Sequence, residues 1–354
     1  MSDERRSSMG FVHNTDLNPG EEYLATVPRV RLVLHHPALL KAFNDYDSIA
    51  DSKQKVFRWS GTVSLLLAGI SLTGIAVELL LGALAVHVDW KVTIVLELCA
   101  ATSVLFALGP WLSRTRTQWL TARFMTEQIR EWHFQLLLDG SLVSKAVAAP
   151  KDFEAERDKR WTRFMAIAPS AEGAMNSFVD AENIVLHHPV QPYGDSATAE
   201  ESLRAYFDLR FQKQLAYFKL MREYFAVRDD WSESIARWMI FFGLLLIAGQ
   251  LALAIVRRSA ETHALHQISE TLFATAIVLV ILSATVRVYR SAVAMSPQRE
   301  RYETKWIRLV TLRVAYEKAP TVQKKLEVMK EVESVEVEEL REFLRQMRRA
   351  SYLL

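Results

Sequence analysis

The sequence predicts an all-α membrane protein with two transmembrane helical hairpins, four spans in all, joined by long cytoplasmic amphipathic helices. Three observations predict this class: four long apolar stretches, their arrangement as two close pairs, and aromatic stripes at helical spacing outside them. A hydrocarbon core about 30 Å thick needs roughly 20 apolar residues in a helix. The stretches that meet or approach this length are Gly61–Val86, Val92–Ser113, Met239–Val256 and Thr271–Val286.

Composition excludes several classes of function. Apolar residues make up 50% of the 354 residues, and the formal net charge of +2 gives no argument for a nucleic-acid partner. The single cysteine, Cys99, lies inside the second span, so an intrachain disulfide is excluded. The first 20 residues are polar and lack the apolar core of a signal peptide, so we expect the first hairpin to direct insertion.

Basic residues at the span ends predict the orientation, because cytoplasmic flanks are enriched in Lys and Arg. The two hairpin tips, Gly82–Lys91 and Arg257–Glu270, contain three basic residues, whereas twelve lie close to the other four ends. The twelve are Lys53, Lys55, Arg58, Arg114, Arg116, Arg123, Arg228, Arg237, Arg287, Arg290, Arg299 and Arg301. Both termini and the central region are therefore predicted to be cytoplasmic.

These features predict five segments. They are a cytoplasmic N-terminal region (1–56), hairpin 1 (57–113), a cytoplasmic helical region (114–235), hairpin 2 (236–292) and a cytoplasmic C-terminal helical region (293–354).

In chain order, residues 1–30 are expected to be flexible, and a helix is expected from Pro37 into the first span. Its Ser60, Ser64 and Ala68 recur at every fourth position, a spacing that favours close packing within the hairpin over an oligomer contact. An aromatic helix follows the hairpin, with its charged residues mostly on another face, and Asp139-Gly140 ends it. Its apolar stripe is Trp119, Ala122, Met125, Ile129, Trp132 and Leu136.

The region 141–198 is the least regular, with a short charged helix expected from Pro150 to about Ala168 and a linker at 188–197. A long helix then starts near Ala199 and leads into hairpin 2, and another follows that hairpin and ends at Pro320. The stripes of these two helices are Phe207, Phe211, Leu215, Phe218, Met221 and Phe225, and Tyr302, Trp306, Leu309, Leu312 and Tyr316. The terminal segment is a charged helix or helix pair that resembles a short coiled-coil arm.

The two halves share an order of elements that indicates an internal duplication. Each has a charged helix, an Arg-Trp pair, a hairpin, a basic step and a Trp-containing helix. The pentapeptide Val-Leu-His-His-Pro also occurs twice, at 33–37 and 185–189.

The sequence lacks enzyme signatures: a glycine-rich phosphate loop, a nucleophile elbow and a Cys-based zinc spacing are all missing. Adjacent histidines (35 and 36, 187 and 188) point apart on any helix or strand, so we expect loop or cap residues there. His263 and His266 share a helix face but lack a third ligand. The prediction is a protein that is not an enzyme and has no cofactor, metal or catalytic residue.

Glu78 and Glu97 are the only charged residues inside the first two spans. Such residues cost several kcal/mol and usually face a bundle interior or an aqueous path. Either they extend to the headgroups or pair with Lys91, or they form a carboxylate ring in an oligomer that would favour cations. Gln250 is the third candidate pore-lining residue. Trp59, Trp238 and Arg287 are predicted interface anchors.

The pattern of a charged helix, a tight hairpin and a Trp/Tyr-and-Arg helix (WLTARFMTEQIREWHF; YETKWIRLVTLRVAYEK) resembles the SLATT superfamily. These are two-transmembrane effector domains found beside nucleotide-second-messenger enzymes in bacterial conflict systems. The resemblance covers Lys41 to about Leu138 and, more closely, EESLRAYFDLRFQKQLAYFKLMREYFAVRDDW through Lys318. It implies a pore-forming or membrane-perturbing effector of antiviral defence in the bacterial inner membrane. It also implies an oligomer that is triggered by a nucleotide or a partner protein.

Two other readings remain. The chain could be a non-conducting, membrane-anchored scaffold or sensor whose helices recruit a cytosolic protein. Bestrophin-type anion channels share a comparable spacing of two separated hairpins, but their Pro-containing pore motifs are missing from this sequence.

Overall fold

The computed structural model describes residues 16–83, 90–181, 193–257, 263–292 and 295–349, and every regular element within these ranges is a helix. The first helices are α2 (Glu21–Thr26), α3 (Arg31–Leu34), α4 (Pro37–Ala83), α5 (Trp90–Leu112) and α6 (Thr115–Leu138). The central ones are α7 (Gly140–Ala148), α8 (Pro150–Met165), a 3₁₀ turn (Ala168–Ser170), α9 (Ala171–Asp180) and α10 (Ser196–Tyr206). A π-turn (Phe207–Phe211) joins α10 to α11 (Gln212–Arg257), followed by α12 (His263–Ala292), α13 (Met295–Lys318) and α14 (Val322–Arg349).

Four of these helices are long and apolar enough to cross a membrane, namely α4, α5, the continuous helix ending in α11, and the segment from α12. By helix length and apolar composition, the predicted all-α membrane fold with four spans is confirmed. The chain divides into two compact units. We call residues 54–116 and 224–299 the hairpin unit, and residues up to 53, 117–223 and 300–349 the helical unit.

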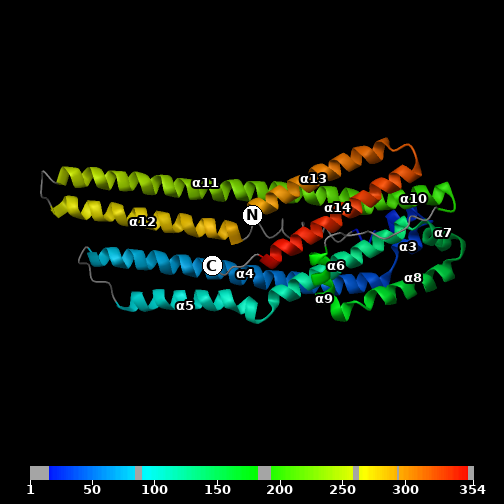
Figure 1. Cartoon of the computed structure of the whole chain (residues 1–354), viewed down its shortest axis with the longest axis horizontal. Coiled ribbons are helices and arrows are strands. Elements are labelled where there is room, and N and C mark those ends of the chain that lie inside the picture. The colour runs from blue at the N-terminus through cyan, green and yellow to red at the C-terminus, as the bar shows by residue number, and fades with distance from the viewer. Residues whose placement is uncertain (1–15, 84–89, 182–192, 258–262, 293–294, 350–354) are drawn as a thin grey trace. The chain divides into compact units, whose positions relative to one another are not determined.

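In the hairpin unit, α4 and α5 lie side by side and are held by hydroxyl groups (Figure 1). The Ser64 hydroxyl donates to the Ser103 carbonyl, and the Ser103 hydroxyl donates back to the Ser64 carbonyl, both at 2.9 Å. Seven residues further along α4, the Ser71 hydroxyl donates to the Leu96 carbonyl at 3.0 Å. A methyl group added at Gly74 would overlap the Leu96 side chain. Ser64 therefore serves packing within the hairpin, as its spacing predicted.

The second hairpin packs in the same way. The Ser283 hydroxyl on α12 donates to the Ala236 carbonyl on α11 at 2.9 Å. A Cβ at Gly243 would lie 3.5 Å from the Ala276 carbonyl oxygen, so the backbones approach closely there. A Cβ at Gly69 would lie 3.1 Å from the Thr285 methyl group, which places α4 of the first hairpin against α12 of the second.

In the helical unit, α6 is covered on most of its circumference rather than on one face. Met125 and Ile129 of the predicted stripe are fully buried, and so is Arg130 on another face. The charged residues were expected mostly on another face than the stripe, and Arg130 lies there. Arg130 is nevertheless fully buried, and its acidic partners are Asp16, which precedes α2, and Glu127 of α6 itself.

The other stripes also lie in the core of this unit. Phe211 and Phe218 are each 1% exposed, and Tyr302 and Leu309 on α13 are buried. The π-turn adds a residue to one helical turn, so the regular 3.6 period expected through Phe207 does not hold there. Phe207 instead stacks on Tyr316, with ring centroids 4.7 Å apart.

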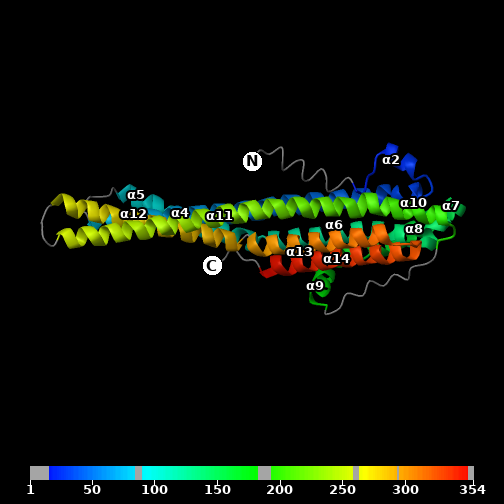
Figure 2. The same cartoon turned by 90° about the horizontal axis from the view of Figure 1, so that it is seen from above.

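Several local predictions need correction. Residues 16–30 are not wholly flexible, because they include α2 and the buried Leu17 and Leu24. The region 141–198 is more regular than predicted, since Asp139 caps α7 by accepting from the Leu142 amide, and α8 ends at Met165. α14 is one helix that runs beside α13 and buries Met329 and Leu344, rather than an isolated coiled-coil arm (Figure 2). The second Val-Leu-His-His-Pro copy lies outside the described residues.

Candidate functional site in the hairpin unit

Glu78, the first predicted pore residue, is half-buried at the contact between α4 and α5. Its carboxylate accepts a hydrogen bond from the Thr93 hydroxyl of α5. The hydrogen bond reduces the cost of placing a carboxylate in a span, because one of its oxygens has a donor. Glu78 therefore belongs to the packing of the first hairpin.

Glu97 lies in a different environment. It is exposed on α5, seven residues after Trp90, which is about 10 Å along the helix. On the same face of α5, Ile94 and Val104 are 42% and 55% exposed. Among the described residues Glu97 makes no hydrogen bond or ion pair. The structure thus separates the two glutamates and leaves Glu97 on an outward apolar face.

The remaining predicted residues lie on the second hairpin and at span ends. Gln250 is half-buried on α11. Trp59 is 61% exposed and contacts Phe106 edge-on, with ring centroids 5.3 Å apart. Trp238 is 59% exposed and stacks on Phe242 at 5.8 Å. Exposed indole rings at span ends fit the predicted role of interface anchors.

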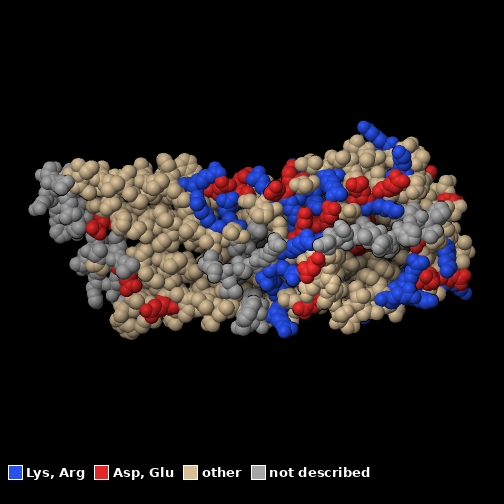
Figure 3. Space-filling view, in the orientation of Figure 1, with Lys and Arg blue, Asp and Glu red and all other residues tan. Residues whose placement is uncertain are grey.

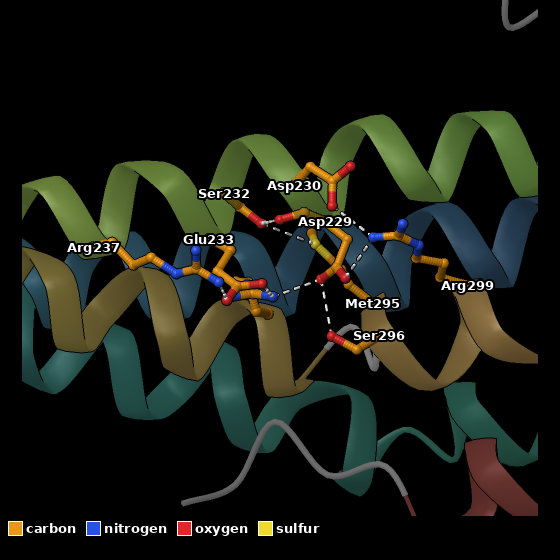
Figure 4. A network of polar contacts seen from close by, with 9 residues as sticks. Asp229, Asp230, Ser232, Glu233, Arg237, Met295, Ser296 and Arg299 are labelled. Carbon is orange, nitrogen blue, oxygen red and sulfur yellow. Dashed lines mark hydrogen bonds and ion pairs between the residues drawn. The ribbon is translucent and has the colours of Figure 1, made fainter.

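A network of charged groups, which the sequence did not indicate, lies where α11 enters its span (Figure 4). The Arg290 guanidinium of α12 donates to Asp229 at 2.7 Å and to Glu233 at 3.2 Å. The Ser296 hydroxyl of α13 donates to Asp229 at 2.9 Å. Burial would raise the pKa of Asp229, but the hydrogen bonds from Arg290 and Ser296 outweigh it and lower that pKa. Asp229 is therefore ionised at neutral pH.

The network continues towards the membrane and away from it. Arg237 donates to Glu233 one helical turn away, and this hydrogen bond lowers the pKa of Glu233. Arg299 donates to Asp230 at 2.6 Å and lies 3.6 Å from Asp229. The spacing of Asp229, Glu233 and Arg237 by fours was the available sequence signal, but only the fold shows that Arg290 lies opposite them.

Beside this network is an open groove of about 420 Å³, lined by Glu233, Ala236, Arg237, Arg287, Arg290, Ser291, Ser296 and Pro297. Arg287, the predicted interface anchor, is exposed at its edge. Over the span helices the visible surface is largely uncharged, whereas charged side chains gather where α12 ends (Figure 3). The groove is therefore a polar, mostly basic site at the boundary of the apolar surface.

The helical unit holds buried charges of its own. Asp16 and Glu127 lie 3.0 and 2.7 Å from the fully buried Arg130, and Glu333 lies 3.2 Å from the buried Arg210. Burial raises the pKa of Glu131 and of Glu336 to about 8. His36 contacts Trp132 and Trp161, and burial lowers its pKa to about 4. Within the described ranges no three His, Cys, Asp or Glu side chains are grouped to hold a metal ion.

Comparisons of the chain with models of protein families, with curated proteins and with solved structures found no match.

Proposed function

We propose that the protein is a membrane effector that assembles into an oligomer and forms a pore, with Glu97 facing the conduction path. The observation that carries this proposal is the position of Glu97: an ionisable side chain on an outward face of a span, without a partner among the described residues. Such residues almost always face a protein interior or water. Contact with another copy along α5 would give Glu97 that environment.

The burial of α5 supports the same arrangement. Its most apolar 18-residue window is 11% buried, against 33% in α4, 17% in the segment from α12 and 6% in the helix ending in α11. The exposed part of α5 differs from that of α11 because it carries a carboxylate. In a monomer this face would be covered by lipid, which solvates Ile94 and Val104 well but not a carboxylate. In a ring of subunits, repeated Glu97 carboxylates would line the path and favour cations.

The biological setting follows from the resemblance in the sequence. We infer that the protein is oriented with both termini in the cytoplasm of the bacterial inner membrane and acts in antiviral defence. The helical unit would receive the trigger, which is a nucleotide or a nucleotide-sensing or nucleotide-synthesising partner protein. Its surface of mixed charge is suited to contact with another protein rather than with lipid.

The test is current across a planar bilayer that contains the purified full-length protein, with Glu97→Gln compared with Glu78→Gln. Gln keeps the volume of the side chain and removes its charge. We expect Glu97→Gln to lower the preference for cations over anions several-fold. Glu78→Gln should change it little, because Glu78 is engaged by Thr93 within the hairpin.

Unchanged conductance and selectivity in Glu97→Gln would remove this residue from the pore. Absence of conductance from the wild type, with its membrane insertion confirmed, would favour the non-conducting scaffold instead.

A further inference from the structure

The groove beside the Asp229 network has more arginine than its acidic neighbours can balance. Its surroundings contain four arginines, Arg237, Arg287, Arg290 and Arg299, and three carboxylates, Asp229, Asp230 and Glu233. Glu233 binds Arg237 and Arg290, Asp229 binds Arg290, and Arg299 lies against Asp229 and Asp230. The remaining positive charge is that of Arg287, which has no acidic partner in the described part of the chain.

The register of the second hairpin fixes the position of Arg287 along α11. Ser283 contacts Ala236, and Arg290 contacts Asp229, so residues whose numbers sum to 519 lie opposite each other on these antiparallel helices. Arg287 is therefore level with Ser232 and one residue from the level of Glu233. Its long side chain can reach the groove, whose edge it forms.

The groove also lies at a defined depth relative to the bilayer. Arg237 is the last charge before the apolar stretch of α11, and Arg287 is the first charge after that of α12. The exposed indole of Trp238 follows Arg237 directly, and indole rings favour the headgroup level. Phosphate groups of lipids occupy this same level on the side that the basic residues predict to be cytoplasmic.

We propose that this groove binds a phosphate group, and that its occupant in the membrane is the headgroup of an anionic phospholipid. Guanidinium groups suit phosphate because their N–H donors form a planar fork that matches two phosphate oxygens. Arg287 supplies the unbalanced charge, and Arg237 supplies a second guanidinium that is 70% exposed at its side chain. The exposed Ser291 lines the same groove and can donate its hydroxyl proton.

The carboxylates do not prevent this binding. Glu233 and Asp229 are the acceptors that hold Arg237 and Arg290 in place, so they orient the basic wall of the groove. Pro297 is the exposed apolar part of the lining and can contact the glycerol end of a headgroup. This site is separate from Glu97, and its occupancy does not depend on whether the protein conducts.

The test is native mass spectrometry of the full-length protein released from detergent after titration with phosphatidylglycerol or with phosphatidylcholine. We expect the wild type to retain phosphatidylglycerol in preference to the zwitterionic lipid. The double variant Arg237→Gln plus Arg287→Gln should lose at least tenfold in affinity for phosphatidylglycerol. Both side chains are exposed, and the ion pair of Arg290 with Asp229 remains. The variant should therefore keep the thermal stability of the wild type.

The matched control is Arg58→Gln, which removes an exposed arginine from the corresponding end of the first hairpin, outside this groove. It should retain phosphatidylglycerol as the wild type does. Equal retention by the double variant and by Arg58→Gln would overturn the proposal, and so would equal retention of the two lipids by the wild type.

A second titration, with inorganic phosphate, distinguishes a lipid headgroup from a soluble phosphate compound as the occupant of the groove. Displacement of phosphatidylglycerol only at phosphate concentrations far above that of the lipid would support the headgroup as occupant. If phosphate alone binds the wild type as tightly as the lipid and is lost in the double variant, the groove is a site for a soluble phosphate compound. Lack of competition at any phosphate concentration would overturn recognition through the phosphate group.

Discussion

At the scale of single residues, charged groups hold the core of the helical unit together. Arg210 is 2% exposed at its side chain, donates to Glu333 at 3.2 Å and lies over the Phe134 ring at 5.4 Å. The Tyr206 hydroxyl donates to the same carboxylate oxygen. Taking two charges from water costs several kcal/mol each, so such a pair contributes little net stability while intact. Losing one partner, however, leaves the other buried and uncompensated.

Replacement of Arg210 by Met should therefore destabilise the protein by about 3–5 kcal/mol, because Glu333 would remain buried without its counter-charge. Replacement of both residues, Arg210→Met with Glu333→Leu, should recover most of that loss. The measurement is thermal and denaturant unfolding in detergent. The control is Arg204→Met, whose side chain is 63% exposed and 3.8 Å from Asp208, with an expected cost below about 0.5 kcal/mol. A double variant no better than Arg210→Met would contradict this account.

The pH dependence of stability also follows from buried residues. Glu131 and Glu336 have folded-state pKa values of about 8, raised by burial, so the folded state keeps their protons where the unfolded state has released them. Their contribution to stability is complete below pH 4.5 and is lost as the pH rises to 8. Burial lowers the pKa of His133 to about 3 and that of His36 to about 4, so their contribution is lost as the pH falls below 6.5.

Above pH 6.5 the contribution of these histidines is largely constant, so the carboxyl groups dominate the change. Burial also raises the pKa values of Glu339 and Asp16, and the comparison with a double variant isolates the part due to Glu131 and Glu336. We expect the wild type to lose about 1 kcal/mol for each carboxyl over this range, less than full burial would give because both side chains keep partial solvent contact. In Glu131→Gln plus Glu336→Gln the slope should become clearly shallower. The measurement is the unfolding temperature as a function of pH. Equal slopes in wild type and double variant would show that these carboxyls titrate normally.

At the scale of elements, the contacts with neighbouring helices determine which face of each helix is buried, more than the sequence pattern of that helix does. The span helices are apolar on all sides, and the reciprocal bonds of Ser64 and Ser103 select the faces that meet. In the membrane apolar burial gives no preference between lipid and protein, so small residues and hydroxyls decide the contact. In the helical unit the aromatic faces of α11 and α13 meet, as the ring contact of Phe218 with Tyr302 at 5.9 Å shows.

Asp substitution at both Phe211 and Phe218 should disrupt this element. Each ring is buried, and removal of a buried Phe costs about 3–5 kcal/mol before the cost of burying a carboxylate is added. We expect loss of cooperative unfolding or a changed particle size in detergent. Leu220→Asp on the same helix, 38% exposed, is the control and should be tolerated. A folded double variant of wild-type stability would mean that the rings are not part of the core.

At the scale of the whole molecule, four apolar helices in two hairpins indicate a multi-pass membrane protein. The hairpin unit exposes large apolar side chains along its helices, among them Leu105 (69%), Leu244 (61%) and Ile255 (74%). Such continuous apolar surface is unfavourable in water and is expected of a surface covered by lipid or by other subunits.

Reporter fusions at Ser113 and Ser259 test this topology. Ser113 follows the second span and Ser259 lies in the tip between the third and fourth, so the two reporters should be in opposite compartments. A fusion after Leu354 should behave like the one at Ser113, because an even number of spans separates them. The same compartment for Ser113 and Ser259 would contradict the four-span arrangement.

The sequence by itself determined the number of spans, their pairing and the helical class. A single stretch of about twenty apolar residues can satisfy its backbone groups within itself only as a helix, so these properties depend on local composition. The same holds for the aromatic stripes, whose spacing predicts a buried face without knowledge of the neighbour. The tip residues and the second Val-Leu-His-His-Pro copy lie largely outside the described residues, so the duplication stays a prediction.

Only the tertiary structure decided which polar residues act together. Glu78 and Glu97 are both single glutamates within apolar spans. Glu78 accepts a hydrogen bond from Thr93, whereas Glu97 faces outward. The difference depends on which side of each helix is covered by the neighbouring helix. Arg290 lies opposite Asp229 through the register of two antiparallel helices, a property of a contact between segments 61 residues apart. Such long-range pairing leaves no periodic trace in either segment, and for that reason the arginine groove could not be predicted from the chain alone.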